Sequence, residues 1–183
     1  MKNTEMHILS QKICKIILAL AFVLLLPVSV TAELYRSTIN EVDVSFEYPK
    51  DWKLREVKGR DEKYNEISIL GPRSEEDKYS CALSVTMYPK ERFASVEEAI
   101  RDYKYKFEKF KEFKVVSSGK EGFEIEYLLR LPLYSPKAKD VKIKEKVMFV
   151  TRDDNCFKLR WNSVEKDYSK YLPAFNTLCE TFQ

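Results

Sequence analysis

The chain has 183 residues, with 32 Lys and Arg against 29 Asp and Glu and a formal net charge of +3. Charges of both signs are mixed along the sequence, which excludes the strongly basic character of a nucleic-acid-binding domain. The only histidine is His7, so residues 33–183 hold no histidine for a Ser-His or Cys-His nucleophile pair or for a histidine metal site.

The first 32 residues have the pattern of a secretory signal peptide. Three lysines precede an uncharged apolar run at positions 16–30, and Val30-Thr31-Ala32 places small residues before a cleavage point. The run is shorter than the roughly 20 residues that a membrane-spanning helix needs. We therefore expect cleavage after Ala32, export to the periplasm or another extracytoplasmic space, and one domain over 33–183. An uncleaved membrane anchor is the alternative.

Three strands are predicted in the first part of the domain. Residues 42–48 alternate apolar and polar side chains until a proline ends the pattern. Trp52, just beyond that turn, is expected to close one end of the core. Further strands are predicted over 64–70, where Gly71-Pro72 ends the pattern, and over 79–88.

Ser95 and Glu98 have the spacing of a capping box, in which each side chain bonds the backbone N–H of the other residue at the start of a helix. The helix is predicted to reach about Phe110. Its lysines either dock on an acidic partner or a membrane, or simply solvate the surface. The buried stripe is predicted to consist of Val96, Ala99, Ile100, Tyr103, Phe107 and Phe110.

Two more strands are predicted at 113–118 and 123–131, followed by a loop from 131 to 139 that contains two prolines. Because loops often carry binding residues, Leu133 and Tyr134 are the candidate contacts for a protein partner. A plain hairpin connection with partly packed apolar residues is the alternative.

A hairpin is predicted next, with strands over 141–151 and 157–161 and a turn at 152–155. Asp153 and Asp154 in this turn lack the spaced oxygen ligands of a calcium loop, and turns favour Asp for backbone reasons. We therefore predict no metal ligand and no other cofactor.

Helices are predicted after the last strand. A short helix is expected over 164–170, and Pro173 is expected to begin a second one that reaches Thr181, because proline suits the first helical turn. Most connections between the predicted strands are too short for parallel crossovers. The fold class is therefore α+β, with a largely antiparallel sheet of about six strands and helices packed on it.

Three cysteines follow the signal segment: Cys81, Cys156 and Cys179. An odd number in an oxidising compartment allows at most one internal disulfide. If the last helix runs back along the last strand, Cys179 comes level with Cys156 and the two pair. Because Cys156 has the opposite strand parity from Phe157, three free thiols are the alternative.

Three stretches resemble the PsbP-like family. FEYPKDW, from Phe46, resembles its strand-Pro-x-x-Trp opening, and SVEEAIRDYKYKFEKF, from Ser95, stands where that family has its first long helix. CFKLRWNSVEKDYSKYLPAFNTLCETF, from Cys156, is similar to its ending, with Thr181-Phe182 as the closing pair. The resemblance implies an α/β/α sandwich and a role in binding or assembly, such as that of the extrinsic photosystem subunits. The chain lacks their long N-terminal extension, and no functional residue is carried over.

These observations predict an exported, non-catalytic accessory protein that contacts an unidentified protein partner, in or near a membrane complex. We expect a monomer that does not span the membrane after cleavage and does not bind nucleic acid. The alternative is a carrier of a small molecule or lipid, which would need a large apolar cavity between sheet and helix.

Overall fold

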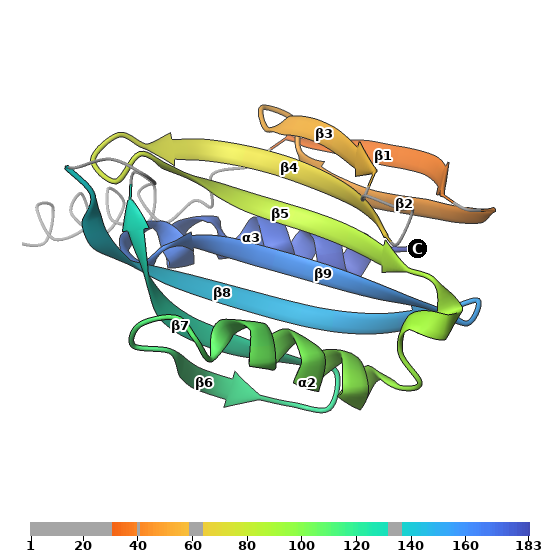
Figure 1. Ribbon diagram of the computed structural model, residues 1–183. Helices are drawn as coiled ribbons and strands as arrows, with labels where there is room; N and C mark the ends of the chain where they lie inside the picture. Colours follow the sequence, from red (N-terminus) through yellow and green to blue (C-terminus); the bar gives the residue numbers. More distant parts are fainter. Residues whose placement is uncertain (1–30, 40, 59–63, 132–136) are drawn as a thin grey trace, which may run out of the picture. The chain divides into compact units, whose positions relative to one another are not determined.

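The structure, a computed structural model, describes residues 31–39, 41–58, 64–131 and 137–183 (Figure 1). Two helices, α2 (Val96–Phe107) and α3 (Glu165–Thr181), and a short 3-10 turn at Lys90–Arg92 accompany the strands. The strands are β1 (Ala32–Ile39), β2 (Val42–Pro49), β3 (Lys53–Lys58), β4 (Asn65–Ser74), β5 (Tyr79–Tyr88), β6 (Lys114–Ser118), β7 (Gly122–Leu131), β8 (Lys139–Arg152) and β9 (Asn155–Val164).

Seven strands form one sheet in the order β3-β4-β5-β9-β8-β7-β6, and every neighbouring pair is antiparallel. β1 and β2 pair with each other in a separate two-stranded sheet. The α+β class and the antiparallel sheet are confirmed. The main sheet has seven strands, whereas about six were expected. β2 is not one of them, but β3, which pairs with β4 along six residues beyond Trp52, is.

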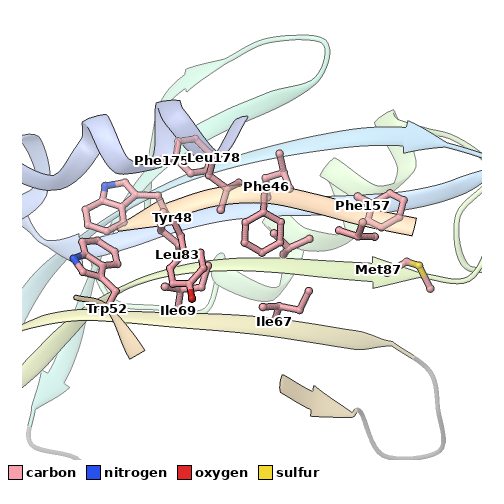
Figure 2. Close-up of a cluster of buried hydrophobic side chains, with 14 of the residues drawn as sticks. Phe46, Tyr48, Trp52, Ile67, Ile69, Leu83, Met87, Phe157, Phe175 and Leu178 are labelled. Atoms are coloured by element: carbon pink, nitrogen blue, oxygen red, sulfur yellow. The ribbon is translucent and has the colours of Figure 1, made fainter. Parts of the chain in front are cut away.

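One face of the large sheet packs against α3 and β2 and is called the α3 face (Figure 2). β4, β5 and β9 each contribute alternate apolar residues, as a strand must when successive side chains point to opposite sides. Trp52 stacks on Trp161 with ring centroids 6.0 Å apart, so it closes the end of this core as expected. The largest fully buried side chains here include Phe46, Ile69, Leu83, Phe157, Trp161 and Phe175.

The opposite face, the α2 face, has a second core beneath α2, which lies over β7 and β8 (Figure 1). Ala99, Ile100 and Tyr103 of α2 are buried there, as the predicted stripe requires. They pack on alternate residues of the two strands, including Phe123, Ile125, Val147 and Phe149. α2 and α3 therefore cover different faces of one sheet.

The predicted capping box of α2 forms only in part, whereas the predicted hairpin turn is present. Ser95 caps α2 by accepting a hydrogen bond from the Glu98 amide, but the Glu98 carboxylate accepts from Ala94 rather than from Ser95. Asp153 and Asp154 both have positive φ in the turn between β8 and β9, which confirms the hairpin.

The expected break at Pro173 is wrong, because α3 runs without interruption from Glu165 to Thr181. Proline inside a helix costs about 3 kcal/mol through a lost hydrogen bond and a steric clash. Pro173 is exposed, while Tyr168, Phe175 and Leu178 are buried on the α3 face. Their burial, worth about 1.5–3 kcal/mol each, offsets that cost.

The expected end of a strand at Gly71-Pro72 is also wrong, since β4 continues to Ser74 with a shift of register between Leu70 and Arg73. A proline is tolerated at such an irregularity, where a ladder hydrogen bond is already absent. Among the helices that the structure describes, none is long and apolar enough to cross a bilayer.

Candidate functional site

Polar side chains occupy the α2 face of the sheet beside the core under α2. Because strand register places facing residues on the same side of a sheet, Thr86 lies opposite Lys158 and Ser84 lies opposite Arg160. We call this group the polar strip. It consists of Glu66 on β4, Ser84 and Thr86 on β5, Glu145 on β8, and Lys158, Arg160 and Asn162 on β9.

The polar strip is centred on an ion pair between Glu145 and Arg160. The Glu145 side chain is completely buried, whereas that of Arg160 remains 25% exposed, and an Arg160 Nη atom lies 2.7 Å from Glu145 Oε2. Tyr103 of α2 donates to the same carboxylate at 2.6 Å, and Tyr127 of β7 at 3.4 Å. A buried carboxylate is tolerated only when it is paired in this way, so Glu145 ties α2 to three strands of the sheet.

Burial and charge act in opposite directions on Arg160. Burial disfavours its charge, but the neighbouring Glu145 carboxylate outweighs burial and holds the pKa of Arg160 well above its ordinary value. For Tyr103, in contrast, burial raises the pKa, and the Glu145 charge raises it further. The guanidinium therefore stays charged, and the phenol stays a hydrogen-bond donor.

Lys158 is the unusual member of the polar strip. It is only 6% exposed, and its ammonium donates to the Tyr88 hydroxyl at 3.1 Å. The ammonium also lies 4.8 Å from the ring centroid of Tyr103. Burial, together with the positive charge of Arg160, lowers the pKa of Lys158 to about 8. No carboxylate of the described residues lies within ion-pair distance of Lys158.

Two atoms of the polar strip are buried without a hydrogen-bond partner among the described residues: Ser84 Oγ and Arg160 Nε. Other members are satisfied. The Asn162 side chain accepts from Tyr79 at 2.8 Å, and the Glu66 carboxylate accepts from Ser68 at 2.7 Å. Because buried polar atoms are nearly always hydrogen-bonded, the two unpaired atoms call for a further hydrogen-bond partner, either ordered water or a bound group.

A second feature lies on the outer side of α2 and along the edge strand β6. Tyr105 is 74% exposed, and Val115 and Val116 are exposed on β6. Lys104 of α2 reaches Ser118 of β6 at 2.8 Å, so the helix and the strand form one continuous surface (Figure 1). We call this the α2–β6 surface, and its residues are Arg101, Lys104, Tyr105, Lys109, Lys114, Val115 and Val116.

The residues singled out from the sequence have different outcomes. Leu133 and Tyr134 lie outside the described residues. Cys156 and Cys179 are both free thiols in the structure, and so is Cys81. Cys156 belongs to the core on the α2 face, whereas Cys179 packs at the core on the α3 face, so the sheet separates the two. Within the described ranges, no group of three or more His, Cys, Asp or Glu residues is placed to hold a metal ion.

Sequence analysis missed the polar strip, although one signal for it was present. Glu145 has the same strand parity as Ile143 and Val147, so it falls among residues predicted to face inward. A charged residue at an inward position predicts a buried partner of opposite charge. That Arg160 is this partner depends on the pairing of β8 with β9 and could not be read from spacing alone.

Neither a family model nor a curated protein matches the sequence. Three solved structures show a similar fold at low identity. LpqN of Mycobacterium tuberculosis, described as involved in cell envelope biogenesis, is 11% identical with a TM-score of 0.48, and the match covers 83% of this chain and 90% of that one.

Cyanobacterial PsbP from Synechocystis is 13% identical with a TM-score of 0.43 and coverage of 85% and 95%. The Saccharomyces cerevisiae Ran-binding protein Mog1p is 10% identical with a TM-score of 0.45 and coverage of 84% and 96%. Cyanobacterial PsbP is a member of the family that three stretches of the sequence resemble.

Proposed function

We propose that this protein is an exported, non-catalytic accessory protein that binds an acidic protein partner through the α2–β6 surface. The observation that carries the proposal is the placement of Tyr105, Val115 and Val116, which stay exposed while most aromatic residues enter the two cores. Exposed aromatic residues surrounded by charge are typical of residues that dominate binding energy at interfaces.

The charge of this region favours an acidic partner. Between residues 101 and 120 the sequence has seven Lys and Arg against three Asp and Glu. Only two of these cations take part in close ion pairs with described residues, Lys106 with Asp102 and Lys111 with Asp140. The remaining cations are available to attract and orient an acidic surface, which raises the association rate more than the final affinity.

The packed interior favours a protein that binds a partner at its surface over a carrier that holds a ligand in a cavity. The space between the sheet and α3, where a carrier would hold its ligand, contains Phe46, Phe157, Trp161 and Phe175, all fully buried (Figure 2). The β1–β2 pair adds Tyr35, which stacks on Phe46 with ring centroids 4.9 Å apart. Opening a cavity there would disrupt a close-packed core. In this proposal Glu145 and its partners hold α2 in position and catalyse no reaction.

The experiment is affinity purification of the full chain from the envelope of its own cells, with Tyr105→Ala as the test variant. The matched control is Tyr64→Ala. Tyr64 is exposed and immediately precedes β4, near the edge of the sheet that lies farthest from β6. We expect one stoichiometric acidic protein with the wild type and with Tyr64→Ala. Its affinity should fall roughly thirtyfold for Tyr105→Ala, the effect of losing about 2 kcal/mol at an interface hot spot.

Two results would contradict the proposal. Equal recovery of the partner by both variants would place the contact elsewhere on the molecule. Recovery of the chain with a bound lipid or other small molecule, and without a protein, would favour the carrier function. The location is tested in the same cells, because the proposal requires the chain in the extracytoplasmic fraction with residues 1–32 removed.

A further inference from the structure

We propose that the polar strip binds a small carboxylate-class monoanion between Ser84, Lys158 and Arg160. The three residues lie on the paired strands β5 and β9, and all point to the α2 face of the sheet. This inference concerns a site apart from the α2–β6 surface and does not depend on the identity of a protein partner.

The hydrogen-bonding groups left over at this position are mainly donors. Arg160 Nε–H is a donor only, and the Ser84 hydroxyl can donate, and neither has a partner among the described residues. Lys158 carries three N–H donors, one of which is directed to the Tyr88 hydroxyl. A group that satisfies these donors must therefore supply acceptors, as the two oxygens of a carboxylate do.

The strip holds two cations, Lys158 and Arg160, and two carboxylates, Glu145 and Glu66, so a large added negative charge is disfavoured there. Arg160 is already paired with Glu145 at 2.7 Å, which neutralises one cation and one anion. Lys158 is left as a buried ammonium without a carboxylate of the described residues at ion-pair distance. A monoanion would give Lys158 the contact at ion-pair distance that Glu66 and Glu145 do not make, whereas a dianion would add twice as much negative charge beside these two carboxylates.

A water molecule could satisfy the unpaired atoms but would leave the Lys158 ammonium without a counter-charge at ion-pair distance, since Glu66 and Glu145 act on it only from farther away. Burying an unpaired ammonium is costly, and an anion removes that cost in addition to forming the hydrogen bonds. Ser84 Oγ and Arg160 Nε are buried, but solvent contacts other parts of the polar strip and its surroundings, because the Arg160 side chain is a quarter exposed and Glu66 and Tyr88 are partly exposed.

The experiment titrates the full chain with acetate at constant ionic strength and follows the side-chain NMR signals of Lys158. We expect saturable binding that raises the pKa of Lys158 above about 8, since a bound anion favours the protonated amine. Binding at pH 9 should be roughly tenfold weaker than at pH 7, because only about a tenth of Lys158 keeps its proton one unit above its pKa.

Ser84→Ala removes one hydrogen bond without changing charge and should weaken acetate binding roughly tenfold, as expected for a hydrogen bond to a charged group. Ser117→Ala, at an exposed position of β6, is the matched control and should leave binding unchanged. Inorganic phosphate, which is largely dianionic above pH 7, should bind more weakly than acetate at pH 9 and compete with it poorly.

Several outcomes would overturn the inference. Lys158 signals that do not respond to acetate, together with a high-resolution structure that shows only water between Ser84 and Arg160, would assign the gap to solvent. Equal binding by Ser84→Ala would place the anion elsewhere. Tighter binding of phosphate than of acetate would exclude a preference for a single charge.

Discussion

The two faces of the central sheet solve the same packing problem with different chemistry. The α3 face is an apolar core in which Trp52, Trp161 and Phe175 fill the space between sheet and helix. The α2 face has an apolar core beneath α2, and beside that core the polar strip buries Glu145 and Lys158 and partly buries Arg160. The first face is expected to supply stability, whereas the second holds charged groups whose pKa values burial and neighbouring charges shift.

The largest expected effect is on the α3 face. Phe175→Ala removes a fully buried ring between the sheet and α3 and should lower the free energy of unfolding by about 4 kcal/mol. Urea unfolding measures it. A change below about 1 kcal/mol would show that this face relaxes into the cavity and is not tightly packed.

Glu145→Gln should cost somewhat less, about 2–3 kcal/mol. Removing one partner of a buried ion pair costs more than this in a fully closed site, but the Arg160 side chain is a quarter exposed and keeps some hydration. Glu180→Gln, at an exposed position of α3, is the control and should change stability by less than about 0.5 kcal/mol. An equal effect at both positions would mean that the polar strip contributes nothing to stability.

Lys158→Met should stabilise the protein near pH 7, by about 2 kcal/mol. The pKa of Lys158 is lowered in the folded state to about 8, so the unfolded chain binds this proton more tightly. Wild-type stability from this group therefore rises with pH between about 8 and the unfolded value near 10.5.

The advantage of Lys158→Met should accordingly shrink across that pH window, which urea unfolding at pH 7 and at pH 9.5 would measure for both proteins. A constant difference between them would show that Lys158 keeps an ordinary pKa.

The smallest expected change in stability comes from the two tyrosines, Tyr103 and Tyr127, that donate to the Glu145 carboxylate. Tyr103→Phe removes a 2.6 Å hydrogen bond to Glu145 and should cost about 1.5 kcal/mol, whereas Tyr127→Phe removes a 3.4 Å contact and should cost less than about 0.5 kcal/mol. Each variant is the control for the other in thermal unfolding. The reverse order would mean that Tyr127, and not Tyr103, carries the main bond to Glu145.

The same two faces show how far the sequence could be interpreted. Alternation along β9 correctly assigned Phe157, Leu159 and Trp161 to one core, because an apolar face has a period that needs no knowledge of its partner. The other parity, Lys158 and Arg160, was interpreted as the polar side of a half-buried strand. Their burial depends on residues from β5 and β8 that lie far away in the sequence.

Helix continuity shows the same limit. Pro173 is a strong local signal for a helix start, and it was outweighed by tertiary contacts of Tyr168 and Phe175 that a local rule does not include. Export, the absence of catalysis and the candidate contacts Leu133 and Tyr134 remain predictions.

The irregularity at Gly71 restricts which amino-acid substitutions are tolerated at and around this position. A side-chain carbon at position 71 would lie 2.6 Å from Cys81 Sγ and 2.7 Å from Trp52 Cε2, although the glycine has no positive φ. Any larger residue there requires the indole or the thiol to move first. Positions 52, 71 and 81 are therefore expected to vary together among homologous sequences, and a substitution at one should be tolerated or harmful according to what occupies the other two.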